Sequence, residues 1–130
     1  MYEILLAVDE KDEHAEAQVD AVLDLPGQDE IHAHVFHDFQ DNPTGASIGQ
    51  LASARHAKDS LEDAGIEVTL HETSGDPSEA ILDTARDLDV DSICVASRKR
   101  TPTGKVLFGS VTQAVILGAD RPVIVCGAES

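Results

Sequence analysis

The sequence has 130 residues, of which 42% are hydrophobic, so it is long enough for one domain with one core and too apolar for a disordered chain. Acidic residues outnumber basic ones by 25 to 9, which gives a formal net charge of −16 at pH 7. Because phosphate backbones are bound by basic surfaces, this charge argues against a nucleic-acid partner. We therefore expect a single domain over residues 1–130 that binds no nucleic acid.

The acidic residues are spread along the whole chain and are not gathered in one tail. Self-repulsion of this size destabilises a small domain at low salt, a balance that halophilic proteins use. We interpret the charge as an acidic surface suited to a salty cytoplasm. No apolar run approaches the roughly 18 residues of a membrane span, and the N-terminal stretch lacks the features of a signal peptide. The sequence predicts a cytoplasmic protein without membrane contact.

Three elements are expected in the first part of the chain. The apolar run at 3–9 predicts a strand that ends at Asp9. Residues 10–27 have apolar residues at helical spacing, acids in the first turn and a Pro-Gly stop. Residues 30–39 alternate as a strand does, with Ile31, Ala33 and Val35 on one face and His32, His34 and Phe36 on the other.

The remaining elements continue this alternation. Asp76 is expected to cap a helix that has Pro77 at its first position. The near-continuous apolar run at 91–97 is typical of a central parallel strand. In chain order we expect a loop at 40–47, a helix at 48–64 closed by Gly65, a strand at 66–72, a helix within 73–90, a strand at 91–97, a helix at 110–120 and a strand at 121–127.

A β-α-β-α-β-α-β-α-β pattern predicts a Rossmann-like, doubly wound parallel sheet of five strands with helices on both faces. Right-handed crossovers and a 3-2-1-4-5 order would place the topological switch point between the first and fourth strands. Such sheets bind ligands at the carboxyl ends of their strands at this point. Asp9 and Ser97 should therefore lie at the ligand-binding crevice.

The segment 96–110 contains four of the nine basic residues of the chain, Arg98, Lys99, Arg100 and Lys105. It ends in Gly109 and Ser110, where the last helix is expected to begin. Free amides and the positive end of the helix dipole make such a start an anion site. The spacing fits neither a Walker A loop nor a dinucleotide fingerprint. A simple helix cap beside a solvated basic loop remains the alternative.

Four stretches carry a resemblance to a known family: "ILLAVDE", "HAHVFHDF", "SGDPSEAILDTARDLDVDSICVASR" and "LFGSVTQAVILGADRPVIVC". Over nearly its whole length the chain resembles the universal stress protein family, and its acidity resembles that of haloarchaeal members. The resemblance implies a sheet of order 3-2-1-4-5, the fold also described as adenine nucleotide alpha hydrolase-like. It also implies a homodimer in which the last strand, residues 122–126 (Pro122 to Cys126), pairs across the two-fold axis.

In nucleotide-binding members of this family, a loop with three spaced glycines followed by Ser or Thr wraps the phosphates. The chain matches this pattern at Gly109 and Ser110, but Ala96 and Lys99 stand where the two earlier glycines are expected. The Lys99 ammonium could neutralise phosphate, or its bulk could close the loop, because a residue with a Cβ loses glycine's conformational freedom. We favour the first interpretation and keep the second open.

The resemblance implies ATP or AMP as the ligand and leaves open whether Mg²⁺ binds together with the nucleotide. Asp9 corresponds to the acid beside the nucleotide, and Val35 to the residue whose backbone meets adenine. The full set of site residues expected from the resemblance and the basic loop is Ala7, Val8, Asp9, Val35, Val95, Ala96, Arg98, Lys99, Gly109, Ser110 and Val111.

Several other residues invite a functional interpretation. His32 and His34 have metal-ligand spacing, but no completing ligand can be named from the sequence, so we interpret them as partly buried histidines and expect no metal site. His37 should lie near the crevice. Cys94 and Cys126 lie in apolar runs and are interpreted as small buried residues.

No serine–histidine–aspartate, cysteine–histidine or paired-carboxylate arrangement is legible, so we expect no catalytic residues and no efficient enzyme, with weak ATPase activity left open. The favoured function is a dimeric nucleotide-binding module of the stress response, whose nucleotide alters the surface offered to a protein partner. The alternative is a nucleotide-free dimerisation and interaction module in which Lys99 blocks the loop.

Overall fold

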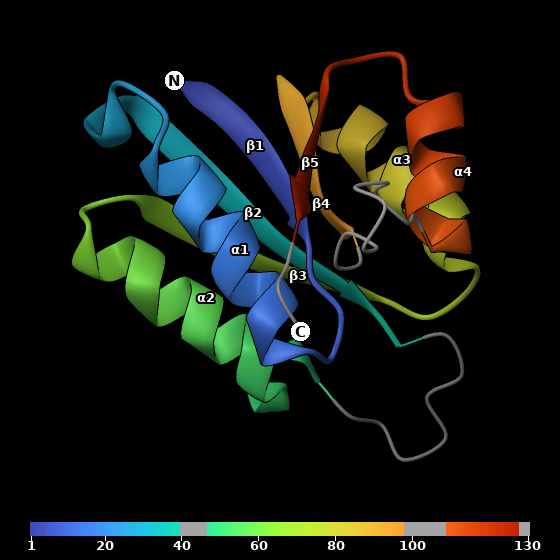
Figure 1. Cartoon of the computed structure of the whole chain (residues 1–130), viewed down its shortest axis with the longest axis horizontal. Coiled ribbons are helices and arrows are strands. Elements are labelled where there is room, and N and C mark those ends of the chain that lie inside the picture. Colours follow the sequence, from blue (N-terminus) through green and yellow to red (C-terminus); the bar gives the residue numbers. More distant parts are fainter. Residues whose placement is uncertain (40–46, 98–108, 128–130) are drawn as a thin grey trace, which may run out of the picture.

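The computed structural model describes residues 1–39, 47–97 and 109–127. Within them the chain alternates strands and helices, as expected (Figure 1). The elements are β1 (Tyr2–Ala7), α1 (Asp12–Leu23), the 3₁₀ turn η1 (Gln28–Glu30), β2 (Ile31–Asp38), the 3₁₀ turn η2 (Ile48–Gln50), α2 (Ala52–Asp63), β3 (Glu67–Thr73), α3 (Pro77–Leu88), β4 (Ser92–Ser97), α4 (Ser110–Gly118) and β5 (Val123–Gly127).

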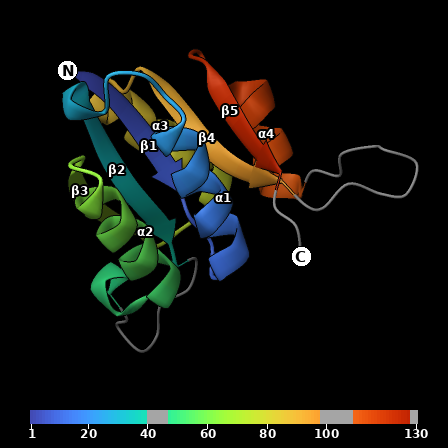
Figure 2. The ribbon, with the colours of Figure 1, turned by 60° about the vertical axis from the view of Figure 1, so that its left-hand side comes forward.

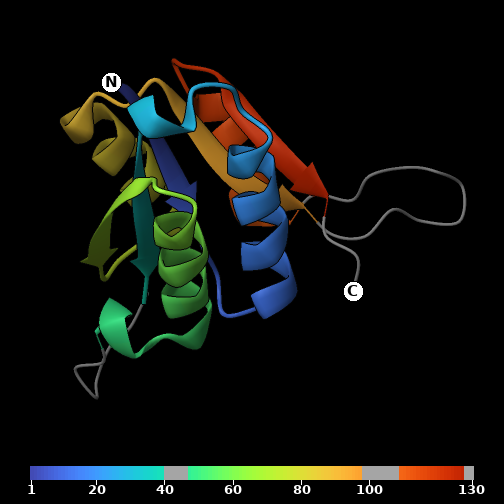
Figure 3. The ribbon, with the colours of Figure 1, turned by 90° about the vertical axis from the view of Figure 1, so that its left-hand side faces the viewer.

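The strands form one parallel sheet in the order β3-β2-β1-β4-β5, which confirms the predicted fold class and order. Central strand β1 pairs with both halves of the sheet, because Leu6 lies opposite Val35 of β2 and Cys94 of β4. Figures 2 and 3 show α1 and α2 together on one face of the sheet. The switch point therefore lies between β1 and β4. None of the described helices is long and apolar enough to span a membrane.

Alternation along the strands divides the core into two layers. Leu6 and Val35 pack with α1 and α2 on one face, whereas Leu5 and Phe36 pack with α3 and α4 on the other. All four of these side chains are at most 1% exposed. Since successive strand residues point to opposite faces, the apolar runs of β1 and β2 supply both layers at once. This double coverage leaves the strand ends as the places where a ligand can reach the sheet.

Two helix boundaries illustrate how local chemistry sets the elements. Asp76 caps α3 as expected, because its Oδ2 accepts a hydrogen bond from the Glu79 amide at 3.1 Å. The helix expected at 48–64 is instead split into η2 and α2, with Leu51 in extended conformation between them. Ser47 and Gln50 form a reciprocal capping box around η2, which closes a separate short turn before α2 begins.

Cys94 and Cys126 are both buried and free, as expected, but the register of β4 and β5 also brings their sulfur atoms to 3.2 Å. The hydrogen bond with Cys126, together with burial, raises the pKa of the Cys94 thiol well above its usual value. Cys94 is therefore a neutral thiol at physiological pH. A neutral buried thiol is a poor nucleophile, and both cysteine side chains pack in the core layer beneath α1 and α2.

Candidate functional site

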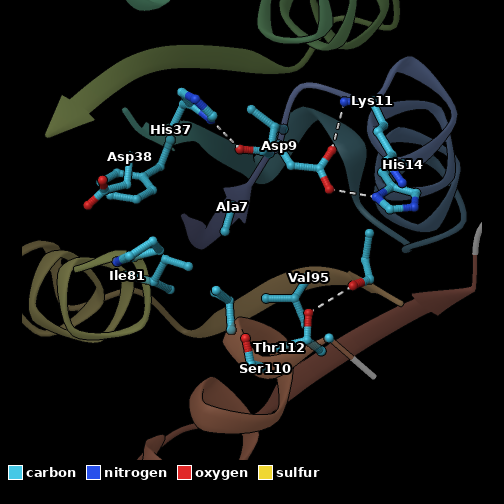
Figure 4. A pocket seen from close by; sticks show the side chains of 16 residues that line it. Ala7, Asp9, Lys11, His14, His37, Asp38, Ile81, Val95, Ser110 and Thr112 are labelled. Atoms are coloured by element: carbon cyan, nitrogen blue, oxygen red, sulfur yellow. Dashed lines mark hydrogen bonds and ion pairs between the residues drawn. The ribbon is translucent and has the colours of Figure 1, made fainter. Parts of the chain in front are cut away.

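A cavity of about 320 Å³ opens at the carboxyl ends of β1, β2 and β4, next to the first turns of α1, α3 and α4 (Figure 4). This is the switch point of the sheet, where parallel α/β folds bind ligands. Its volume lies at the lower end of the range of roughly 300–1,000 Å³ for small-molecule sites. The lining residues are Ala7, Val8, Asp9, Lys11, His14, Phe36, His37, Asp38, Pro77, Ile81, Val95, Ala96, Gly109, Ser110, Val111 and Thr112.

Asp9 forms one wall of the cavity and is held by the start of α1. Its Oδ1 accepts a hydrogen bond from the Lys11 amide at 2.9 Å, and its Oδ2 lies 2.6 Å from His14 Nδ1 (Figure 4). The Asp9 carbonyl accepts a hydrogen bond from Ser53 Oγ at 2.5 Å. The Asp9 side chain is nevertheless 51% exposed, and a carboxylate has about four acceptor sites, so it can still accept hydrogen bonds from a ligand.

Residues at the end of β2 form a second wall. His37 Nδ1 lies 2.7 Å from the Val8 carbonyl, which fixes the imidazole against the end of β1. Its ring also meets Phe39 edge to face, with centroids 4.6 Å apart. Asp38 accepts hydrogen bonds from Thr73 Oγ1 at 3.0 Å and from the Gly75 amide at 3.2 Å, so its carboxylate ties β2 to the segment before α3. His37 therefore lies at the crevice, as the sequence predicts.

The opposite wall is the N-terminus of α4. Gly109 is the N-cap and Ser110 the first helical residue, as expected. The first helical hydrogen bond runs from the Gln113 amide to the Gly109 carbonyl at 3.0 Å, so the amides of residues 110–112 precede any intrahelical acceptor. Thr112 Oγ1 donates to the Ala96 carbonyl at 2.9 Å and anchors this turn to β4. The arrangement presents backbone donors and the positive end of a helix dipole to the cavity.

Gln18, which the sequence did not single out, lies beneath the cavity and hydrogen-bonds to the strands that form its floor, β1 and β4. Its side chain is fully buried, and its Nε2 donates to the Ala7 carbonyl at 2.9 Å and to the Cys94 carbonyl at 3.1 Å. These carbonyls belong to β1 and β4, the two strands that meet at the switch point. One amide group thus bridges the strands beneath the cavity floor.

Most of the site residues predicted from the sequence lie together around this cavity. They are Ala7, Val8, Asp9, Val95, Ala96, Gly109, Ser110 and Val111. The Val35 side chain is 0% exposed and lies in the core layer beneath α1 and α2, and Phe36, next along β2, lines the cavity; the expected contact of adenine with the Val35 backbone stays a prediction. Arg98 and Lys99 lie outside the described residues.

Several lining residues were not among the site residues predicted from the sequence. These are Lys11, His14, Phe36, Asp38, Pro77, Ile81 and Thr112. A signal was present for some of them, since residues at the end of one predicted strand and at the start of the following helix should reach the same edge of the sheet. No local pattern indicated His14, whose imidazole reaches back from the first turn of α1 to Asp9.

This chain is similar in sequence and in fold to known proteins. Residues 1–127 match the Universal stress protein family. A universal stress protein of Methanocaldococcus jannaschii is 40% identical over 68 residues, which cover 52% of this chain and 42% of that relative. The matched segments span about half or less of the length of the curated relatives.

Two solved structures of universal stress proteins from Archaeoglobus fulgidus are similar over the whole domain. One has a TM-score of 0.78 and 30% identity, and the match covers 97% of this chain and 98% of that one. The other, solved in complex with dAMP, has a TM-score of 0.69 and 25% identity, with coverage of 97% and 98%. The fold, the strand order and the match over residues 1–127 agree, and the chain belongs to the universal stress protein family.

Proposed function

We propose that the chain binds an adenine nucleotide, AMP or ATP, in the cavity at the carboxyl end of the sheet and acts as a stress-response module without strong catalysis. The observation that carries the proposal is the pairing of two unlike walls across one cavity: the amides at the start of α4 on one side and the Asp9 carboxylate on the other (Figure 4). The similar protein from Archaeoglobus fulgidus, which was solved with dAMP, supports the same ligand class.

The two walls suit the two halves of a nucleotide. The α4 amides and the Ser110 hydroxyl would donate hydrogen bonds to a phosphate, for which a helix N-terminus is favourable. Asp9 would accept hydrogen bonds from ribose hydroxyls, because a carboxylate there would repel a phosphate. The apolar side chains of Ala7, Val95 and Ile81 would pack against the nucleoside. The ligand would therefore lie across the carboxyl ends of β1 and β4.

Mg²⁺ would fit only as a companion of a triphosphate. It prefers oxygen ligands and usually bridges one or two carboxylates to substrate phosphates. Among the described residues that line the cavity, Asp9 offers a carboxylate whose side chain is 51% exposed, whereas Asp38 is buried. AMP would need no metal, so the two nucleotides should differ in their dependence on Mg²⁺.

The proposed module is a homodimer in a salty cytoplasm. β5 is an edge strand of the sheet, and its exposed backbone edge is available for pairing with a second copy. Val125 on this strand is 37% exposed, which gives the edge some apolar surface. The net charge of −16 suits high salt. Nucleotide binding would act by shifting the population of surfaces offered to a partner protein.

Calorimetric titration with AMP and with ATP, each with and without Mg²⁺, in high salt tests nucleotide binding. The matched variants are Ser110→Asp and Ser110→Asn. An acid at the first helical position is compatible with the helix dipole, so the fold should persist. Close to phosphate, however, its charge should cost about 3 kcal/mol, which corresponds to about 100-fold in affinity. The neutral Ser110→Asn should remain within roughly tenfold of the parent.

Absence of heat and of a thermal shift for the parent chain at millimolar nucleotide would sink the proposal and favour a nucleotide-free interaction module. Comparing the nucleotide affinity of Lys99→Gly with that of the parent chain then distinguishes the two proposed functions. If Lys99 blocks the loop, its replacement should create binding that the parent lacks. If Lys99 neutralises phosphate, the parent binds and the replacement weakens binding.

A further inference from the structure

A second cluster of chemistry-bearing residues lies at the amino ends of β1 and β2. Glu3 lies opposite His32 in the parallel register, and His34 follows two residues later on the same face of β2. The side chains of His32 and His34 are 19% and 6% exposed, and that of Glu3 is 26% exposed. The sequence indicated the two histidines, but only strand pairing brings Glu3 to them.

The three side chains converge on one point. Glu3 Oε1 lies 2.9 Å from His32 Nδ1 and 2.8 Å from His34 Nε2. One donor atom from each residue lies within 4.8 Å of the others, and the two imidazole rings have centroids 4.1 Å apart. Metal bonds of about 2.0–2.2 Å in a tetrahedron need donor atoms roughly 3.3 Å apart. Small movements of the partly exposed Glu3 and His32 side chains would be needed to bring the donor atoms to this spacing.

The outer nitrogen of each imidazole also has a fixed partner. His32 Nε2 lies 2.7 Å from Thr69 Oγ1, and His34 Nδ1 lies 2.8 Å from His71 Nε2. Both partners come from β3, the neighbouring edge strand. Histidines that ligate metals usually donate their second ring N–H to such a partner, which fixes ring orientation and tautomer. The cluster thus has an outer shell as well as an inner one.

The outer hydrogen bonds, to Thr69 and His71, can form with and without a bound metal. Without a metal, the inner ring nitrogens donate to Glu3, and the outer nitrogens accept from the Thr69 hydroxyl and from His71. With a metal, the inner nitrogens give up their protons and the outer nitrogens donate instead. A hydroxyl both donates and accepts, and a neutral imidazole can change tautomer, so both outer hydrogen bonds are kept, while metal–ligand bonds replace the two inner hydrogen bonds to Glu3. The network is therefore prepared for metal ligation.

We propose that Glu3, His32 and His34 bind a divalent transition-metal ion of the Zn²⁺ type. Two imidazoles and one carboxylate are the ligand set of zinc sites that keep a fourth position open. Glu67, whose Oε2 lies 3.7 Å from His32 Nδ1 and whose side chain is 64% exposed, would fill the fourth position after moving toward Glu3 and His34. Otherwise a water molecule completes the coordination.

This site is separate from the nucleotide cavity and does not depend on it. Glu3 precedes Ala7, the last residue of β1, by four positions, which correspond to about 13 Å along a strand. Figure 2 shows β1 and β2 running from the end of the sheet near the N-terminus toward the end that carries the cavity. The ligand set also differs in kind, because Mg²⁺ prefers oxygen atoms and would not select two imidazoles.

The test is titration of the untagged, chelator-treated chain with Zn²⁺, followed by calorimetry, and with Co²⁺, followed by its visible absorption. We expect one equivalent of Zn²⁺ bound at micromolar affinity or tighter, a rise in the unfolding temperature, and the intense absorption of tetrahedral Co²⁺. Glu3→Gln and His32→Gln should each lower the affinity by about 100-fold or more, and His71→Gln by about tenfold through loss of its outer hydrogen bond.

His56→Gln is the matched control, because His56 is exposed on α2, on the opposite face of the sheet from the cluster. It should leave the stoichiometry and affinity unchanged. Both Glu3→Gln and His32→Gln alter partly exposed side chains, so circular dichroism should show the parent fold. The proposal is overturned if the parent binds no Zn²⁺ below millimolar concentration, or if folded Glu3→Gln and His32→Gln retain parental affinity.

Discussion

At the carboxyl end of the sheet, the cavity sets the backbone amides at the start of α4 against the Asp9 carboxylate, whereas at the amino end β1 and β2 bring one carboxylate and two imidazoles to a single point. The first arrangement presents amides and a helix dipole, which favour an anion. The second presents nitrogen and oxygen donors, which favour a cation. The same three strands, β1, β2 and β3, contribute to both regions or support them.

The difference shows how a chain with few cations can still provide an anion site. With nine basic residues against 25 acids, positive side-chain charge is scarce. A helix N-terminus supplies positive potential from the backbone, which costs the sequence no Lys or Arg. Acids and histidines are available for a cation site, and they need only the right register to meet. The charge composition therefore limits which charged side chains are available at each end of the sheet. It does not limit the positive potential that the backbone amides of a helix N-terminus provide.

The largest expected effect is that a substitution at either end of the sheet weakens only the ligand proposed to bind at that end. Ser110→Asp should lower nucleotide affinity by about 100-fold and leave Zn²⁺ affinity within roughly threefold, because the charge is screened over the distance between the sites. His32→Gln should do the reverse. Calorimetric titration of both variants with both ligands measures all four values. If either folded variant lost affinity for both nucleotide and Zn²⁺, the two ends would be coupled.

A smaller effect is expected from Gln18→Met, which keeps the length of the side chain and removes the amide. Two buried carbonyls would lose their donors, so the free energy of unfolding should fall by about 1–3 kcal/mol, as measured by urea denaturation. Nucleotide affinity should fall as well, whereas Zn²⁺ affinity should stay at the parental value.

Gln113→Met serves as the control for this change, since Gln113 is exposed on α4. It should leave the unfolding free energy within about 0.5 kcal/mol of the parent. Equal stability of Gln18→Met and the parent chain would mean that the bridge between β1 and β4 does not hold the cavity floor.

The smallest expected effect concerns the helix cap beside the cavity. Hydrogen bonds from the Glu79 amide and the Ser78 hydroxyl lower the pKa of Asp76 below its ordinary value of 3.8. A lowered pKa contributes stability that is present above the ordinary value and is lost as the pH falls through the lowered one. The unfolding temperature of the parent should therefore fall more steeply below about pH 4 than that of Asp76→Asn, which caps without titrating.

Thermal unfolding of both chains from about pH 7 to about pH 3 measures this difference, and taking the difference removes the contribution of the other carboxylates. Parallel curves over the whole range would contradict a titrating cap at α3. The comparison also concerns the cavity, because Pro77 follows the cap directly and lines one wall.

Much of the fold and part of the site could be predicted from the sequence. The alternation of elements, the Asp76 cap and the start of α4 at Ser110 follow from local signals, and the structure confirms them. The first strand ends at Ala7, two residues before the expected end at Asp9, and Asp9 nevertheless lines the cavity. The split of the helix expected at 48–64 was missed, because helical composition outweighed the reciprocal bonds of Ser47 and Gln50. The contact expected between adenine and the Val35 backbone stays a prediction, because the structure shows only that the Val35 side chain lies in the core.

The sequence by itself determined the order of strands and helices, their approximate ends and the resulting parallel sheet, because periodicity, caps and stop signals act over a few residues. Tertiary structure alone decided which distant side chains meet. Glu3 reaches His32 and His34, Gln18 reaches two strands, and the Cys94 and Cys126 sulfur atoms touch, through strand register and helix packing. Such contacts join residues far apart in the chain, so no local pattern encodes them.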